Sequence, residues 1–250
     1  MPSDTYRWLA KYYDHLFDFR RPFDVARQHT VDPILPDVAS ACDLCCGTGT
    51  MALRFAAKGI QTFAVDLSPD MCRIARRKAR EAALPVRVIR AEMQDFRLPQ
   101  SVDLVTCEFD ALNHLPRKRD LLRVAKSVAR ALRPGGHFVF DVNNRLAFER
   151  IWSNTWFLDK DPVALVMHGG HEPGSDRAWS DVEWFVRTGR SWKRYHEHIE
   201  EVCWSAAEIR DALERAGFGS IRSWDAAPFF HDALTRAGNR TFWRARKAPV

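Results

Sequence analysis

Between residues 41 and 142, apolar runs with the length of buried strands alternate with segments whose apolar residues recur at helical spacing. The predicted strands are 41–45, 62–66, 86–90, 102–107 and 137–142, and the predicted helices are 50–58, 69–83 and 118–132. The last helix is expected to stop at Pro134, Gly135 and Gly136, because proline and glycine interrupt helices. Strands that alternate with helices in this way are typical of a parallel sheet covered by helices.

The pattern differs on either side of this region. Two helices are predicted before it, in TYRWLAKYYDHLF and FDVARQHTV, separated by Arg20, Arg21 and Pro22. After Asn144, residues 151–204 hold six of the nine tryptophans and alternate apolar with polar positions, which favours antiparallel strands. A helix over 206–216, a strand near 221–224 and a final strand over 240–247 follow.

These elements predict an α/β fold: a Rossmann-like, seven-stranded, mostly parallel sheet with helices on both faces, and an antiparallel cap inserted after the fifth strand. The expected organisation is an N-terminal helical lid (1–36), a core (37–145), the cap (146–204) and a C-terminal part of the core (205–250). With 46% apolar residues, a chain of 250 residues can bury such a core.

The composition favours a cytoplasmic protein without a membrane segment. No apolar run approaches the roughly 20 residues that cross a bilayer, and the first residues do not form a basic segment followed by an apolar one. The six cysteines lie mostly in apolar, strand-like stretches, which is typical of reduced core residues. Cys42, Cys45 and Cys46 have no second cysteine pair at a zinc-like distance, so no metal site is expected there.

A net charge of +6 raises the question of a nucleic-acid partner, since basic surfaces bind phosphates. The basic residues are dispersed along the chain, however. Their densest run, residues 73–80, lies on a predicted amphipathic helix and is interpreted as a solvated helix face. Nucleic acid is therefore not an expected partner.

The segment from Asp43 to Thr50 (DLCCGTGT) ends the first predicted strand and begins the next helix. Glycine at this turn lets the backbone approach a ligand, and the free amides at the start of a helix favour a polar or anionic group. The spacing Gly47-x-Gly49-x-x-Ala52 also fits a permissive dinucleotide fingerprint, so a nicotinamide-dependent oxidoreductase stays an alternative.

Acidic residues lie in or directly after three of the predicted strands, near the same edge of the sheet. Asp43 lies four residues before Gly47, where its carboxylate can accept from a cationic amino group or fix the loop, but would repel a pyrophosphate. Asp66 ends the second strand, at a distance suited to two ribose hydroxyls, and Glu92 and Met93 follow the third. Taken singly, Asp43 is also compatible with a turn former and Asp66 with a helix cap, but their joint occurrence points to a bound nucleoside.

Together with VDLVTCEFDALNHL and ALRPGGHFVFDVN, these positions resemble the class I S-adenosylmethionine-dependent methyltransferases over about residues 39–142. The resemblance implies that the loop from Asp43 to Gly49 wraps the methionine part, that Asp66 holds the ribose, and that Glu92 and Met93 contact adenine. Cys45 and Glu92 depart from the Gly or Ala and the Asp that are usual in the family. The cofactor residues implied are Tyr13, Asp43, Cys45, Gly47, Gly49, Asp66, Leu67, Met71, Glu92, Met93, Cys107 and Glu108, the last two through main-chain atoms.

His114 follows the fourth strand and is therefore expected to face the site, either as a proton acceptor or as a structural loop histidine. The start of the chain and the pair Asn113-His114 resemble small-molecule N-methyltransferases, including those that act on amino sugars. This closer resemblance implies that Tyr6 and Tyr13 close over the cofactor and the reacting centre, and that His114 handles the acceptor.

The predicted cap offers four further histidines, His168, His171, His196 and His198, and one of them is expected to line the acceptor pocket. His196 and His198 point to one side of a strand, which is also a metal-ligand spacing, but no paired carboxylate or cysteine accompanies them in the sequence. No metal is predicted. One or two of the cap tryptophans are expected to line the pocket as well.

The predicted function is transfer of a methyl group to a nitrogen or oxygen of a small molecule, with S-adenosyl-L-methionine as the cofactor. Three alternatives stay open: a nucleic-acid methyltransferase, an NAD(P)-dependent oxidoreductase and a non-catalytic S-adenosylmethionine-binding protein. The first is disfavoured because the fourth strand ends in CEFD rather than in an Asn/Asp-Pro-Pro-Tyr loop that grips a base amine. The sequence leaves the oligomeric state open, and it is compatible with a homodimer.

Overall fold

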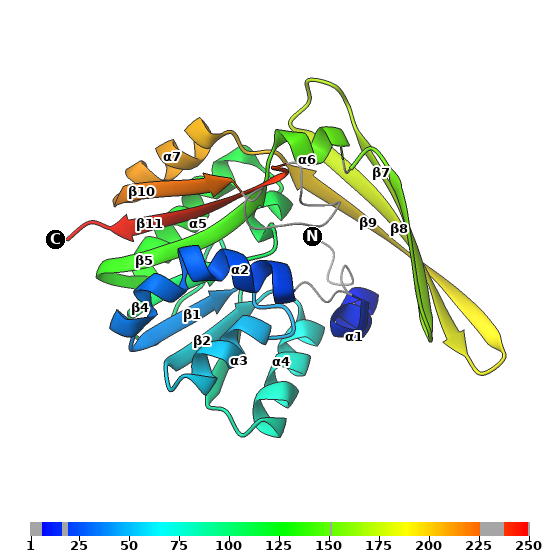
Figure 1. Ribbon diagram of the computed structural model, residues 1–250, viewed down its shortest axis with the longest axis horizontal. Helices are drawn as coiled ribbons and strands as arrows, with labels where there is room; N and C mark the ends of the chain where they lie inside the picture. The colour runs from blue at the N-terminus through cyan, green and yellow to red at the C-terminus, as the bar shows by residue number, and fades with distance from the viewer. Residues whose placement is uncertain (1–6, 17–19, 151, 226–237, 250) are drawn as a thin grey trace.

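The computed structural model describes residues 7–16, 20–150, 152–225 and 238–249, which form two sheets (Figure 1). The larger sheet has seven strands in the order β10-β11-β5-β4-β1-β2-β3. Its strands are β1 (Ser40–Leu44), β2 (Gln61–Asp66), β3 (Val86–Arg90), β4 (Val102–Cys107), β5 (Leu132–Asn143), β10 (Phe218–Asp225) and β11 (Arg240–Lys247). Strands β1 to β5 pair in parallel, and β11 is antiparallel to both β5 and β10. The predicted seven-stranded, mostly parallel sheet is therefore confirmed.

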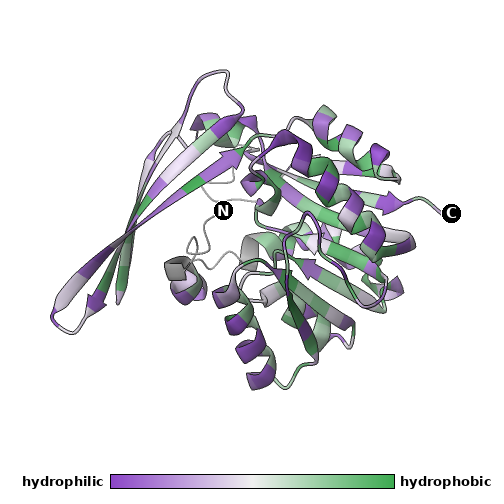
Figure 2. Ribbon diagram, turned by 180° about the vertical axis from the view of Figure 1, so that it is seen from behind, coloured by the Kyte–Doolittle hydropathy of each residue, from purple (hydrophilic) through white to green (hydrophobic). Residues whose placement is uncertain are grey.

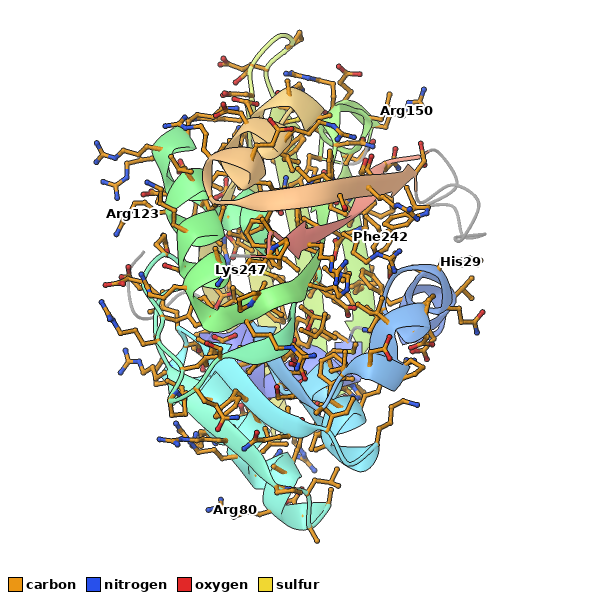
Figure 3. All side chains as sticks on the ribbon, turned by 90° about the vertical axis from the view of Figure 1, so that its left-hand side faces the viewer. His29, Arg80, Arg123, Arg150, Phe242 and Lys247 are labelled. Carbon is orange, nitrogen blue, oxygen red and sulfur yellow. The ribbon has the colours of Figure 1, made fainter. Side chains whose placement is uncertain are left out.

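Helices cover both faces of this sheet, with α2 and α3 on one side and α5 and α7 on the other (Figures 1 and 3). The helices are α1 (Arg7–Leu16), α2 (Arg20–Thr30), α3 (Thr50–Ala57), α4 (Pro69–Glu81), α5 (Lys118–Ala131), α6 (Arg145–Arg150) and α7 (Ala206–Arg215), with short 3₁₀ helices η1 (Asp32–Asp37) and η2 (Ala111–His114). Figure 2 shows apolar strands inside and polar outer helix faces. No helix among the described residues is long and apolar enough to cross a membrane.

Helix α4 explains the basic run of the sequence. Ser68 caps its first turn by accepting from Met71 N at 3.3 Å, and Pro69 fits the first helical position. Its apolar side is buried, whereas Arg73, Arg76, Arg77 and Arg80 are exposed. In Figure 3, Arg80, Arg123 and Arg150 lie at separate corners of the molecule and do not form one basic patch.

Strand β5 differs from the expectation at its start. It begins at Leu132, five residues before the predicted strand, and so includes Pro134, Gly135 and Gly136, with a left-handed φ of 78° at Gly135. A Cβ atom on Gly136 would lie 3.0 Å from the carbonyl oxygens of Arg133 and Asp103, so only glycine fits this close approach. Helix α6, directly after β5, was not predicted.

The smaller sheet is fully antiparallel, in the order β6-β7-β8-β9, and stands beyond the carboxyl ends of the core strands (Figure 1). Its strands are β6 (Thr155–Lys160), β7 (Val163–His171), β8 (Arg177–Thr188) and β9 (Ser191–Val202). Tyr12 and Leu16 of α1 pack against Leu165, Val182 and Trp184 of this sheet. The antiparallel sheet after β5 is as predicted, and its strands fall within the proposed cap (146–204), although the division into domains remains a prediction.

Candidate functional site

A cavity of about 580 Å³ opens between the carboxyl ends of the core strands and the inner face of the cap sheet. Parallel sheets bind ligands at this edge, where the loops after successive strands converge. The predicted site residues that line it are Tyr13, Cys45, Gly47, Asp66, Leu67, Met71, Glu92, Met93, Glu108 and His114. The structure thus brings together residues from α1 and from the loops after β1, β2, β3 and β4. Tyr6, the other predicted catalytic residue, lies outside the described residues.

A second cavity, of about 460 Å³, adjoins the first. The two share the lining residues Tyr13, Cys45, Gly47, Glu108 and Phe109. Asp43 and Arg27 line only the second cavity. Gly49 and Cys107 line neither, so among the predicted cofactor residues they lie behind the surface of the site. Burial raises the pKa of the Tyr13 hydroxyl, which therefore stays protonated between the two spaces.

Asp43 makes the contacts of a residue that fixes the loop. Its carboxylate is 3% exposed and accepts from Ala52 N at 3.0 Å and from the Thr106 hydroxyl at 3.3 Å. Burial, followed by the nearby charge of Glu108, raises the pKa of Asp43 to about 7. Of the two roles left open by the sequence, the observed hydrogen bonds are those of loop fixation.

Gly49 adopts a φ of +85°, and a Cβ atom there would lie 3.0 Å from Ala75 Cβ. Cys45 and Gly47 also have positive φ, at 56° and 53°. Cys45 shows that the turn tolerates a side chain at one such position, whereas Gly49 combines the positive φ with a close approach of α3 to α4 that a Cβ atom would crowd.

Asp66 joins this turn to the loop after β2. Its Oδ2 accepts from Gly47 N and its Oδ1 from Ser68 N, both at 2.8 Å. Burial raises the pKa of Asp66, and these backbone donors oppose the shift. A carboxylate offers about four lone-pair positions, and the amides of Gly47, Ser68 and Leu67 use most of them, which leaves room for a hydroxyl donor in the cavity. We call Cys45, Gly47, Asp66, Glu92 and Met93 the rim.

His114 sits at the other end of the cavity. Asn113 holds η2 between β5 and β9, because its side-chain amide donates to Asn143 O at 3.0 Å and to Val202 O at 2.9 Å. The His114 Nε2 atom lies 3.8 Å from Asp110 Oδ2 and 3.7 Å from Glu201 Oε1. Burial lowers the pKa of His114 and the Asp110 carboxylate opposes this, so the imidazole is neutral at neutral pH. A neutral imidazole can accept a proton.

The sequence did not predict the ionic network around His114. Arg240, from β11, pairs with Asp110 at 2.6 Å and also with Asp141 of β5. Asp141 is fully buried and accepts from Phe109 N at 2.8 Å and Asp110 N at 2.9 Å. These bonds hold Phe109 and Asp110 at φ values of 62° and 48°, which non-glycine residues rarely adopt. We call Asp110, His114, Asp141, Glu201 and Arg240 the acceptor end.

A second missed pair lies beside the smaller cavity. The Nε atom of Arg27, from α2, donates to both carboxylate oxygens of Glu108 at 3.1 Å, and its Nη1 atom donates to Asp24 at 2.9 Å. Nothing in the sequence of α2 distinguishes Arg27 from a surface arginine. Only its 5% exposure in the folded chain identifies it as part of the site.

The cap contributes apolar side chains and Glu201 rather than histidine. His168, His171, His196 and His198 line neither cavity, so the pocket role expected for one of them does not hold for these two spaces. His196 and His198 instead face Asp181 and Glu183 on the exposed side of β8 and β9. The cap residues that line the first cavity are Trp152, Leu165, Met167, Val182, Trp184, Ile199 and Glu201. Two of the cap tryptophans therefore reach it, as expected.

Comparisons with known proteins agree with this geometry. Residues 41–136 match the family described as "Methyltransferase domain". YqeM of Bacillus subtilis (strain 168), a candidate methyltransferase, is 28% identical over 246 residues, which span 97% of each chain. The dTDP-4-amino-2,3,4,6-tetradeoxy-D-glucose N,N-dimethyltransferase of Saccharopolyspora spinosa is 32% identical over 161 residues, covering 64% of this chain and 59% of that protein.

Two solved structures show the same fold over almost all of the chain. An S-adenosylmethionine-dependent methyltransferase from Clostridium acetobutylicum ATCC 824 superimposes with a TM-score of 0.81, at 25% identity, covering 97% of this chain and 99% of that one. An amino pentose methyltransferase from Micromonospora echinaspora, solved with S-adenosylmethionine bound, gives a TM-score of 0.72 at 22% identity and 96% coverage of both chains. At that identity the second likeness concerns the fold alone.

Proposed function

Because the chain belongs to the class I S-adenosylmethionine-dependent methyltransferases, we propose that it methylates a nitrogen or oxygen of a small molecule held under the cap. The observation that carries this proposal is the cavity itself, which has the rim at one end and a neutral His114 at the other. When bound, S-adenosylmethionine supplies an electrophilic methyl group on a positively charged sulfur. The chain's own residues must hold both reactants in line and accept a proton.

The rim fits the nucleoside part of the cofactor. Asp66 lines the cavity with a carboxylate that can still accept from a ribose hydroxyl, and Glu92 and Met93 line the cavity where adenine is expected. Cys45 lies beside Met93, with 3.9 Å between the two sulfur atoms, and gives this wall soft, apolar contacts.

The smaller cavity suits the amino-acid part of the cofactor. An α-amino acid carries a carboxylate next to an ammonium, and Arg27 and Glu108 present the two matching charges side by side. Asp43 then acts indirectly, since it fixes the turn that separates these charges from the rim.

His114 is the proposed proton acceptor. Its imidazole lines the cavity on the cap side, and its pKa is lowered by burial, so a lone pair is available at neutral pH. The site gives no support to a dinucleotide, because Glu108 and Asp110 already pair with Arg27 and Arg240, the cations that a pyrophosphate would need. The dispersed arginines give no support to a nucleic-acid acceptor.

Calorimetric titration with S-adenosylmethionine, S-adenosylhomocysteine and NAD tests the cofactor part of the proposal. We expect micromolar binding of the first two and none of NAD. Asp66→Asn should weaken binding by about tenfold or more, because charge-assisted hydrogen bonds to the ribose are lost. Asp70→Asn is the control: Asp70 lies in the first turn of α4, just after the same loop, but lines neither cavity. This change should leave the affinity for the cofactor unchanged.

Methyl transfer from labelled cofactor to a panel of amines, alcohols, phenols and carboxylates tests the acceptor part. Formation of a labelled small-molecule product supports the proposal. Binding of NAD in place of S-adenosylmethionine would overturn it, and so would labelling of RNA with no transfer to any small molecule.

A further inference from the structure

The acceptor side of the cavity carries more buried acids than bases. Glu108 is paired with Arg27, and Arg240 serves both Asp110 and Asp141. Among the described residues, the only basic side chain within 4 Å of the Glu201 carboxylate is His114, at 3.7 Å. Since the imidazole is neutral, the positive charge that acts on Glu201 is that of Arg240, which already pairs with Asp110 and Asp141. Burial and the neighbouring Asp110 carboxylate raise the pKa of Glu201 well above its ordinary value, so Glu201 holds a proton in the free protein, and a bound cation would stabilise its ionised form.

Glu201 is placed where it can meet such a cation. It ends β9, at the point where the chain passes from the cap to the core, and is only 1% exposed. Its Oε2 accepts from the Asn143 side chain at 3.1 Å, which fixes the carboxylate. Ligand atoms of Asp110, His114 and Glu201 all lie within 4.8 Å of one another, and all three residues line the cavity.

The facing wall has a different character. Leu165, Met167, Val182 and Ile199 give it a continuous apolar surface from β7, β8 and β9. Trp184 adds a ring whose Nε1 donor is already used, because it donates to Glu197 at 2.9 Å. These five side chains offer a bound molecule van der Waals contact. None of them has a hydrogen-bond donor left for it. This wall suits an apolar body and suits a hydroxylated one poorly.

We propose that the acceptor is a primary or secondary aliphatic amine on an apolar body, with its ammonium group between Glu201 and Asp110 and its body against the cap wall. The inference rests on the proposed function and names the substrate class of that site. An alcohol of the same shape lacks the positive charge that would stabilise the Glu201 carboxylate in its ionised form. A divalent cation would meet the same three residues, but the guanidinium of Arg240, 2.6 Å from Asp110, would repel it more strongly than it repels a singly charged ammonium.

The chemistry is balanced for such an acceptor. His114 takes one proton from the ammonium, which frees the nitrogen lone pair. The nitrogen attacks the methyl carbon, the N–C bond forms as the C–S bond breaks, and the electron pair of the broken bond stays on sulfur as a neutral thioether. The product is a methylated ammonium, so the positive charge ends beside Glu201, and the proton on His114 passes to solvent.

The test compares two molecules of nearly the same shape, cyclohexylmethylamine and cyclohexylmethanol, on protein saturated with S-adenosylhomocysteine. Calorimetry should show the amine binding at least tenfold more tightly than the alcohol. Glucosamine, an amine on a hydroxylated body, should bind more weakly than cyclohexylmethylamine. With labelled S-adenosylmethionine, only cyclohexylmethylamine should give substantial product.

Variants locate the effect. Glu201→Gln should lower the affinity for the amine at least tenfold, to the level of the alcohol, and should leave the affinity for the alcohol unchanged. Glu200→Gln is the matched control, because it makes the same change one residue earlier on β9, on an exposed side chain that does not line the cavity. The comparison of the amine with the alcohol on the unaltered chain needs no variant and stands even where Glu201→Gln fails to fold.

Three results would overturn the inference. The alcohol could bind as tightly as the amine and be methylated in its place, which would leave the proposed function intact. Mn²⁺ could bind stoichiometrically in the unaltered chain but not in Glu201→Gln and be required for transfer, which would make the acidic group a metal site. If S-adenosylhomocysteine itself did not bind, the proposed function would fall first and the inference with it.

Discussion

The rim and the acceptor end of the cavity are built in different ways. Each rim residue lies at the end of a core strand or in the short segment after it, and Asp66 accepts from the backbone of Ser68, two residues away, and of Gly47, 19 residues away. The acceptor end joins distant segments, and Arg240 meets Asp110 across 130 residues. The rim is thus fixed by backbone geometry and the acceptor end by buried charge. A site divided in this way can keep one cofactor while its acceptor changes.

The largest expected effect separates the two regions by function. His114→Gln should lower kcat by about 100-fold or more, because glutamine cannot accept the proton. The affinity for S-adenosylmethionine should not change, since His114 lies away from the rim. Single-turnover transfer of labelled methyl, with calorimetry on the same preparation, measures both quantities. A parallel loss of cofactor affinity would contradict the division of the cavity.

The second prediction concerns stability at the acceptor end. Arg240→Met should lower the free energy of unfolding by about 3 kcal/mol, because it leaves Asp110 and the fully buried Asp141 without their shared counter-charge. Urea denaturation measures the change. Arg222→Met, at an exposed position on β10, is the control and should change the stability by less than about 0.5 kcal/mol.

Adding Asp110→Asn to Arg240→Met sharpens the same point. The double variant removes one of the two stranded charges and should recover part of the lost stability. If it were less stable than Arg240→Met alone, the loss would come from packing of the arginine side chain and not from its charge.

The same division explains what the sequence could predict. The order of strands and helices, and the rim residues, follow from local patterns: an apolar run, a turn rich in glycine, and an acid after the strand. The start of β5 was wrong because Pro134 and the two glycines after it were interpreted as a turn. The close approach of Gly136 to the carbonyl oxygen of Asp103 on β4 arises only in the folded chain, and β5 includes all three residues.

The acceptor end could not be found in this way. Alternation along β9 indicates two faces, but it does not say that the face with Glu201 meets Asn143 and His114 of the core. Arg27 and Arg240 look like surface arginines until the distant acids that they pair with are known. The one local signal was the position of Asp110 and Asp141, which follow or end predicted strands in CEFD and FVFD.

A smaller effect is expected at the turn that supports the rim. Gly49→Ala should lower the free energy of unfolding by about 1–2 kcal/mol, because φ is +85° and the new Cβ atom would lie 3.0 Å from Ala75 Cβ. Gly219→Ala is the matched control, since nothing lies within 4 Å of its added Cβ and its φ is not positive. Equal effects of the two changes would show that the turn is not conformationally restricted.

The smallest effect is a shift in the titration of His114, and it tests the balance of forces at the acceptor end. Burial lowers the pKa of His114 below the ordinary value of about 6.5, although Asp110 opposes the shift. More than half of the imidazole should therefore be neutral at that pH in the free protein. The NMR titration of its ring signals, assigned by their loss in His114→Gln, measures the midpoint.

The sign of the shift also has a consequence for stability. Since the pKa is lower in the folded chain than in the unfolded one, the unfolded chain binds more protons in this range, and His114 makes the folded chain less stable as the pH falls through it. A midpoint above 6.5 would mean that Asp110 and Glu201 outweigh burial. The resident cation would then be the imidazolium, Glu201 would already have its partner, and the acceptor end would repel an ammonium instead of binding one.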